Sequence, residues 1–224
     1  MFYQLSPSDL TFLWDECPRC FYLKVVHKYN RPWSPFPSIF NRIDKIMKDY
    51  YEGKPTSSIS AVLPEGVITT GEKWVQSIPI TFAASPTSAQ IRGKFDATIA
   101  FSDGSYGVID FKTSQPKQEH VDFYSRQLHS YSYALENPAS GAYSLRPITR
   151  LGLLCVEPVS MDLNTPNQIA YLGNVTWLDC PLDYQKFFNF LEGVLRVLND
   201  PSPPKSSANC NYCQYRESSR RTNW

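Results

Sequence analysis

The sequence lacks several features that would place it in a class at once. Lysine and arginine, 22 in all, nearly balance the 21 aspartates and glutamates, so the formal net charge is +1. This balance gives no overall electrostatic attraction to nucleic acid, although it leaves room for a local basic groove. No apolar run is long enough to span a bilayer, so we expect no membrane association.

Other absences bear on the location of the protein and on its domain organisation. The N-terminal segment MFYQLSPSDL does not have the basic and then apolar layout of a signal peptide, so we expect a cytoplasmic protein. No G-x-x-x-x-G-K-[ST] loop is present, which excludes a P-loop motor within this chain. There is no internal repeat. The 224 residues, 42% of them apolar, suit one domain with a substantial core.

Hydrophobic periodicity predicts an α/β fold with a mixed sheet. A loop rich in glycine, proline and serine is expected from residue 53 to about residue 72. The order of the elements is helices, a meander of strands, a helix, two strands and a helix, which is typical of an α/β layout. Helices are expected at 6–28 (interrupted near Pro18), 38–52, 118–136 and 181–199, and strands at 74–82, 89–101, 105–112, 148–157 and 168–178.

Two charged residues lie within the expected strand YGVIDFK, at Asp110 and Lys112. Charged side chains are seldom buried unless they are paired or bind a metal. Asp96, in GKFDATIAF, precedes Asp110 by fourteen residues across a tight SDG turn, so both acids can converge at one end of the sheet. The alternative is a salt-bridged pair on an edge strand with Asp96 in a turn.

Two neighbouring carboxylates stay ionised only when a cation lies between them, and otherwise one of them takes a proton. Oxygen ligands of this kind suit Mg²⁺ or Mn²⁺. Lys112 could orient a water or balance charge in a transition state. Together these groups make phosphodiester hydrolysis chemically reasonable.

Four of the six cysteines form two Cys-x-x-Cys pairs near opposite ends of the chain, Cys17 with Cys20 and Cys210 with Cys213. In a cytosolic protein such cysteines indicate metal or thiol chemistry more than disulfides. Four thiolates suit Zn²⁺ or an iron–sulfur cluster if the two ends meet in space. The alternative is four reduced thiols or two unrelated pairs. Cys155, in RLGLLCVEP, is expected to be a small core residue.

The order and spacing of three motifs resemble the RecB-like branch of the PD-(D/E)xK nuclease superfamily. The resemblance covers most of the chain and implies a restriction-endonuclease-like core, with a mixed central sheet flanked by helices. The motifs are a G-x-x-D strand from Gly93 to Asp96, the D-x-K strand of Asp110 and Lys112, and a helix bearing Gln127 and Tyr131.

The resemblance also implies roles for these residues. Asp96 and Asp110 would hold a divalent metal, Mg²⁺ or Mn²⁺, with help from the Phe111 carbonyl. Lys112 would position the attacking water. The helix pair named above would support the site or contact the nucleic-acid backbone.

Many RecB-like members add a metal-binding histidine on the second helix, and this chain has none in 38–52. Asp44 could substitute as an oxygen ligand, with Asn41 as the other candidate, and the alternative for Asp44 is a solvated helix charge. His120 and His129 are expected at the surface.

The segments CPRCFYL and CNYCQYR resemble elements of cluster-bearing RecB-like nucleases such as the CRISPR-associated adaptation exonucleases. Those proteins bind a [4Fe–4S] cluster through one N-terminal and three C-terminal cysteines. Here the last family cysteine falls at Ser219 and Cys20 is additional. We therefore expect a [4Fe–4S] cluster, with zinc as a close alternative, joining the N- and C-terminal ends.

The resemblance implies a metal-dependent deoxyribonuclease, either an exonuclease or a single-strand-directed enzyme. Its partners would be DNA and a helicase, repair or CRISPR-associated protein. The alternatives are a weak or inactive nuclease-fold module that binds nucleic acid or a partner protein, and a redox or metal sensor built on the cysteines. We expect one domain over 1–224, with a helical part at 1–52, a catalytic core at 73–180 and a C-terminal helix and cysteine tail at 181–224.

Overall fold

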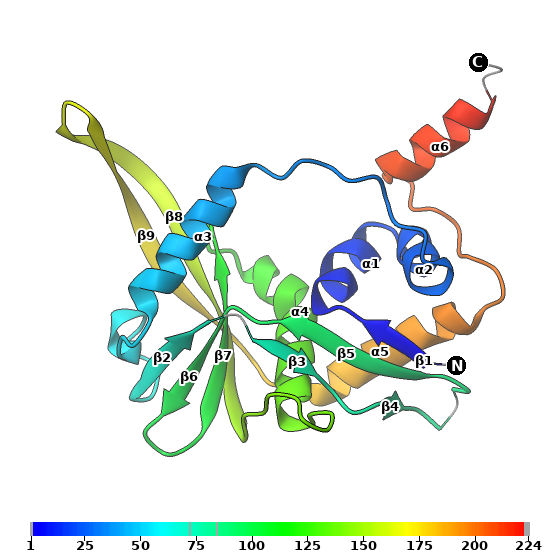
Figure 1. Ribbon diagram of the computed structural model, residues 1–224, viewed down its shortest axis with the longest axis horizontal. Helices are drawn as coiled ribbons and strands as arrows, with labels where there is room; N and C mark the ends of the chain where they lie inside the picture. Colours follow the sequence, from blue (N-terminus) through cyan, green and yellow to red (C-terminus); the bar gives the residue numbers. More distant parts are fainter. Residues whose placement is uncertain (1, 72, 84, 222–224) are drawn as a thin grey trace.

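The computed structural model describes residues 2–71, 73–83 and 85–221 (Figure 1). The elements, in chain order, are β1 (Phe2–Leu5), the π-helical turn η1 (Asp9–Leu13), α1 (Trp14–Glu16), α2 (Pro18–His27), α3 (Ser38–Tyr51), the 3₁₀ turn η2 (Thr56–Ser58), β2 (Gly66–Thr70), β3 (Trp74–Gln76), β4 (Ile80–Thr81), β5 (Ser88–Lys94), β6 (Ala97–Phe101), β7 (Tyr106–Lys112), α4 (Gln118–Glu136), β8 (Ile148–Thr165), β9 (Gln168–Cys180), α5 (Tyr184–Asn199) and α6 (Asn211–Arg221).

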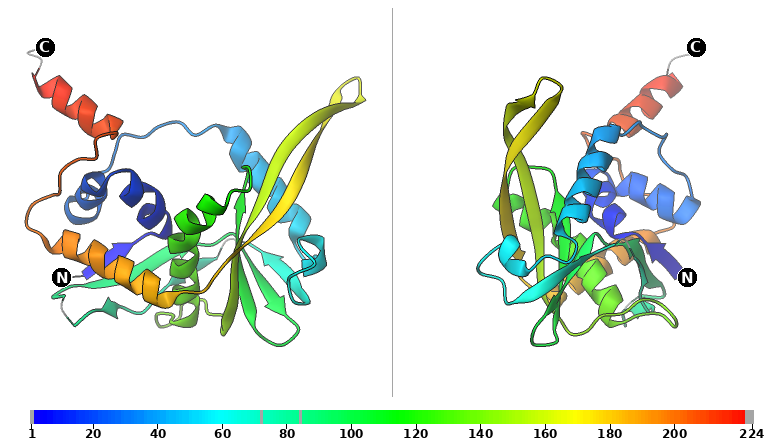
Figure 2. Two further views of the ribbon diagram at one scale, coloured as in Figure 1. Left: turned by 180° about the vertical axis from the view of Figure 1, so that it is seen from behind. Right: turned by 60° about the vertical axis from the view of Figure 1, so that its left-hand side comes forward.

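The larger sheet is mixed, as expected. Its strands lie in the order β2-β6-β7-β8-β9, with β7 and β8 parallel and the other neighbours antiparallel. Helix α3 packs on one face and α4 on the other (Figures 1 and 2). This mixed α/β arrangement is consistent with a restriction-endonuclease-like fold.

Strand β7 shows how the sequence separates the two faces. Ile109 and Phe111 are buried on the α3 side, where the Phe111 ring stacks on Tyr51 with centroids 5.8 Å apart. Val108 is buried in the core on the α4 side. Because successive side chains of a strand point to opposite faces, Asp110 points to the α4 side like Val108.

A second, smaller sheet is built around β5, which pairs in parallel with β1 and antiparallel with β3 and β4. The sequence predicts one strand over 89–101, and this prediction is wrong. The chain leaves the smaller sheet after Lys94 and enters the larger one at Ala97, so Asp96 lies at the junction. Both halves alternate like half-buried strands, and alternation alone does not show that a chain changes sheets.

Other boundaries also differ from the sequence-based expectation. The sequence pattern does not predict strand β1, and β2 lies inside the expected loop, whose end at residue 72 falls outside the described residues. The expected strand 74–82 is divided into β3 and β4 around Pro79, which has no N–H for a sheet ladder. The break in the first helix lies at Cys17, with φ −161° and ψ 101°, because a residue before proline is driven towards extended backbone.

The hairpin of β8 and β9 is longer than expected, and its far half extends beyond the rest of the sheet (Figures 1 and 2). Apolar side chains there are exposed, with Leu163 at 78% and Tyr171 at 72%. The helix expected at 118–136 is confirmed as α4, and the expected C-terminal helix is confirmed as α5, three residues shorter at its start.

Gly93 of the G-x-x-D motif is required by a close approach. A Cβ added there would lie 2.7 Å from Pro7 Cδ and 3.2 Å from Tyr131 Cε1. In contrast, a Cβ added at Gly193, inside α5, would meet nothing within 4 Å.

We expect Gly93→Ala to lower the free energy of unfolding by about 1–3 kcal/mol through overpacking. The matched change Gly193→Ala should raise it by about 0.5–1 kcal/mol, because alanine is the better helix former. Urea denaturation measures both values. Equal effects of the two substitutions would contradict the packing argument.

Candidate active site and cysteine centre

A cavity of about 550 Å³ lies where β7 ends and β6 begins, lined also by residues of α3 and α4, and we call it the acidic cavity. The residues singled out from the sequence for metal binding or catalysis contribute to its lining: Asp44, Asp96, Asp110, Phe111, Lys112, Gln127 and Tyr131. Segments far apart in the chain therefore bring these side chains to one place.

Asp110 is almost fully buried, with 2% of its surface exposed. Its Oδ2 forms an ion pair with Lys112 Nζ, and its Oδ1 accepts a hydrogen bond of 3.1 Å from Gln127 Nε2. Burial raises the pKa of Asp110 to about 7, and the nearby Asp96 carboxylate also raises it while Lys112 opposes the rise. The carboxyl group is therefore held close to its titration point near neutral pH.

Lys112 remains an ammonium despite its burial. Burial lowers its pKa, but the Asp110 carboxylate outweighs this effect and the net shift is upward. Its Nζ also lies 4.1 Å from the centroid of the Tyr124 ring, a favourable position for a cation. A charged ammonium thus faces the acidic cavity next to a buried carboxyl group.

Asp96 turns from the sheet junction towards β7 and accepts a hydrogen bond of 3.1 Å from the Phe111 N–H. Its Oδ1 lies 2.9 Å from Lys48 Nζ, and that ammonium also lies 2.7 Å from Asp44 Oδ2. The Lys48 ammonium therefore lies between two carboxylates, in the position that a metal ion bound by both would take. Carboxylate oxygens around such a position fit a hard divalent ion.

Sequence reasoning did not identify Lys48, although a signal was present. Lys48 follows Asp44 by one helical turn, and residues four apart share a helix face. The Asp44 side chain is 37% exposed and pairs with Lys48, so its role as a metal ligand stays a prediction.

Gln127 and Tyr131 both lie on the buried side of α4, where Gln127 Nε2 is 3.4 Å from the Tyr131 hydroxyl. Gln127 Oε1 is buried and finds no hydrogen-bond partner among the described residues. Buried polar atoms of this kind usually bond to water or a ligand. Burial also raises the pKa of Tyr131, so its hydroxyl stays protonated.

The expectation that His129 lies at the surface is wrong. It is 1% exposed, and its Nε2 accepts a hydrogen bond of 2.8 Å from the Asp183 N–H at the start of α5. Its face of α4 is covered by α5, which periodicity within α4 could not reveal. His120 is half-buried, with its ring edge against Tyr124. Neither lines the acidic cavity as the structure describes it.

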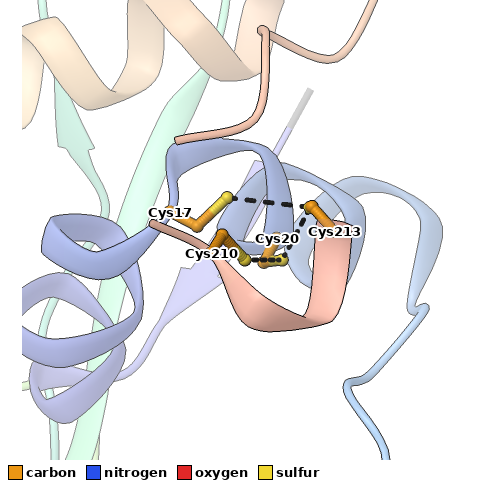
Figure 3. A group of neighbouring side chains, drawn as sticks. All are labelled: Cys17, Cys20, Cys210 and Cys213. Atoms are coloured by element: carbon orange, nitrogen blue, oxygen red, sulfur yellow. Dashed lines mark hydrogen bonds between the residues drawn. The ribbon is translucent and has the colours of Figure 1, made fainter. Parts of the chain in front are cut away.

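The two Cys-x-x-Cys segments, far apart in the sequence, meet at a second site, the cysteine centre formed by Cys17, Cys20, Cys210 and Cys213 (Figure 3). All four are buried, and their sulfur atoms lie within 4.8 Å of one another. The Cys20–Cys213 and Cys20–Cys210 sulfur distances are 3.6 and 3.7 Å, and that of Cys17–Cys213 is 4.0 Å. A tetrahedral ion with Zn–S bonds of about 2.3 Å places its sulfurs about 3.8 Å apart.

Arg31 lies beside the cysteine centre. Its Nη2 donates to Cys210 Sγ at 3.4 Å, and its Nη1 is 2.6 Å from Glu16 Oε2. A guanidinium at this position offsets the negative charge of thiolates. Cys155, as expected, is a fully buried core residue away from this centre.

A family model described as the PD-(D/E)XK nuclease superfamily matches residues 65–218. The chain belongs to this superfamily. The matched region runs from the start of β2 into α6, so it includes Asp96, Asp110 and Lys112 but not the N-terminal cysteine pair. Nuclease-superfamily membership accounts for the order of the motifs, and the RecB-like branch stays a prediction.

Four solved chains match this nuclease-superfamily protein, and one of them is the crystal structure of SSO0001. The TM-score is 0.50 at 17% identity, over 96% of this chain and 84% of that chain. At this level of identity the similarity shows a shared fold alone. No curated protein matches the sequence. None of the helices in the described residues has the length and apolar character needed to cross a bilayer.

The raised pKa of Asp110 predicts a pH dependence of stability when no divalent cation is added. The group titrates near pH 3.8 when unfolded and near pH 7 when folded. Between these values the folded state holds the extra proton, so the free energy of unfolding falls as pH rises and the loss is complete above about pH 7. Asp110→Asn cannot show this change. We therefore expect the variant to gain stability relative to the wild type across this window in urea denaturation, whereas parallel profiles would contradict the assignment.

Proposed function

We propose that the protein is a Mg²⁺- or Mn²⁺-dependent nuclease that hydrolyses DNA phosphodiester bonds, acting as an exonuclease or on single strands. The observation that carries this proposal is the buried Asp110 carboxyl group, in contact with Lys112 and next to Asp96 at the acidic cavity. Membership of a nuclease superfamily supports it.

The residues suggest a division of roles. Asp96 and Asp110 would hold the divalent ion, with the Phe111 carbonyl and Asp44 as further oxygen donors. When bound, such an ion polarises a phosphoryl oxygen and lowers the pKa of water. The Lys112 ammonium is placed to orient the attacking water and to offset negative charge that develops on the phosphate.

The helix pair would act through Asp110 and the substrate. Gln127 donates to Asp110 Oδ1 and so fixes the orientation of that carboxylate. Its buried Oε1 leaves an acceptor available for a water. Tyr131, protonated and at the cavity, can donate to a phosphate oxygen.

A second candidate is a module that binds nucleic acid without cutting it. The observation in its favour is the pair of ion contacts made by Lys48. Among the described residues that line the cavity, three carboxylates stand against three ammonium groups, those of Asp44, Asp96 and Asp110 against those of Lys48, Lys94 and Lys112. The formal charges of this lining therefore cancel, and the cavity attracts a divalent ion less strongly than three unpaired acids would.

Cleavage of end-labelled single-stranded DNA distinguishes the two candidates. We expect Mg²⁺- or Mn²⁺-dependent cleavage by the wild type and a loss of about a hundredfold or more in Asp110→Asn and in Lys112→Met. The matched control is Lys45→Met, since Lys45 is 72% exposed on α3 and pairs with Asp49 instead. Gel analysis of the products also shows whether cutting starts from an end. Wild-type binding without cleavage in either ion would favour the binding module.

We further propose that the cysteine centre binds one structural zinc ion, since its sulfur distances fit a single tetrahedral ion. A [4Fe–4S] cluster, which the sequence resemblance favours, places a cube of iron and sulfide between its thiolates and requires wider spacing. Arg31 would serve as a compensating cation beside either group.

Elemental analysis of anaerobically purified protein tests this proposal. We expect one zinc per chain and no visible absorption in the wild type, and loss of that zinc in Cys213→Ser. Cys155→Ala, which changes a buried thiol outside the centre, should retain the metal. A brown protein that contains iron would contradict the zinc proposal and favour an iron–sulfur cluster.

A further inference from the structure

A second cavity, of about 530 Å³, lies directly beside the acidic cavity, and the two share Ser8, Lys94 and Tyr131 in their linings. Its walls come from the segment after β1, from α2 and its C-terminal end, and from β3 and β5. The two cavities therefore adjoin one another, and the candidate catalytic groups line one of them.

The charge of this second cavity differs from that of the whole chain. Among the described residues, its lining holds the cations Lys24, Lys28, Arg92 and Lys94 and a single carboxylate, Asp9, which pairs with Lys24 at 2.7 Å. Four positive groups against one negative leave a net charge of +3, although the whole chain carries only +1. We call this cavity the basic groove.

Trp74 supplies an aromatic surface to the basic groove and is 55% exposed. It pairs with Lys94 across the β3–β5 ladder, and Arg92 lies two residues earlier on the same face. The Arg92 guanidinium is 4.8 Å and the Lys94 ammonium 5.6 Å from the indole centroid. Exposed aromatic rings that alternate with cations are the usual means of stacking bases and holding phosphates in single strands.

We infer that the basic groove binds single-stranded nucleic acid, with one base stacked near Trp74, and leads the strand to the acidic cavity. Stacking on a protein ring requires an unpaired base, and a paired duplex does not offer the base faces that Trp74 would contact. The binding of a single strand is inferred from the residues of the groove alone. Its delivery to the acidic cavity for cleavage rests on the proposed nuclease function.

Fluorescence anisotropy of a fluorescein-labelled oligothymidylate, with the full chain and no added Mg²⁺, tests the binding step. We expect Trp74→Ala to weaken binding about tenfold and Trp74→Phe to retain most of it, because a phenyl ring can still stack. Arg92→Glu should weaken binding at least as much as Trp74→Ala and reduce the slope of log affinity against log salt. Arg196→Glu is the matched charge reversal, on an exposed residue of α5 outside both cavities, and should change binding less than twofold.

Thermal unfolding of each variant shows that the protein remains folded, and Arg92→Gln replaces Arg92→Glu if the reversal prevents folding. Unchanged affinity in Trp74→Ala and in the Arg92 variant would overturn the inference. So would a blunt duplex that binds as tightly as the single strand and loses affinity equally in Trp74→Ala.

Parallel cleavage assays separate this inference from the nuclease proposal. If the wild type cleaves DNA while the groove variants bind and cleave as it does, the groove assignment fails and the nuclease proposal stands. If the wild type binds single strands through Trp74 and Arg92 but never cleaves, the groove assignment stands and the protein is a binding module.

Discussion

The burial of the Asp110 carboxyl group against Lys112 is the interaction on which the candidate active site depends. A carboxylate taken out of water is strongly unfavourable unless a partner charge and hydrogen bonds compensate it. Strand β7 supplies the ammonium two residues later on the same face, and α4 supplies the Gln127 amide. Both partners are needed at once, so the packing of α4 on the sheet is part of the electrostatics of the site. The raised pKa of Asp110 shows that these partners do not fully compensate the cost of burying its charge. A bound metal cation would offset the rest of that cost.

The change of sheet between β5 and β6 connects this site to the basic groove. Within five residues the chain places Arg92 and Lys94 on the outer face of the smaller sheet, Gly93 against Pro7 and Tyr131, and Asp96 at the acidic cavity. The alternation of a strand directs the two cations outward and the glycine inward. The junction then releases Asp96 from the ladder, so its carboxylate can reach the Phe111 N–H.

Local sequence patterns predict the elements that are stabilised mainly by residues close to them in the sequence. The limits of α4 follow from its helical hydrophobic periodicity, and the hairpin of β6 and β7 follows from the SDG turn between them. Sequence patterns failed where distant segments decide the outcome. His129 is buried because α5 covers it. Strand β2 is a short β-branched run inside a segment rich in glycine, proline and serine, and it pairs with the edge of β6. Lys48 enters the cavity through the way α3 packs, which its own helix pattern does not specify.

The cysteine centre joins α2 to α6, but the two helices depend on it to different extents. Helix α2 is anchored without it, because Phe21 and Tyr22 are buried in the main core and the Tyr22 hydroxyl bonds to the Asp200 carbonyl at 2.8 Å. Helix α6 has no such anchor, since Cys213 is the one buried residue among those described for it. A metal bound there would join positions 193 residues apart and close a long loop, but closure entropy grows only with the logarithm of loop length. A metal in the centre would therefore fix α6 far more than α2, and the two lysines at the basic groove, Lys24 of α2 and Lys28 just after it, would keep their place without it.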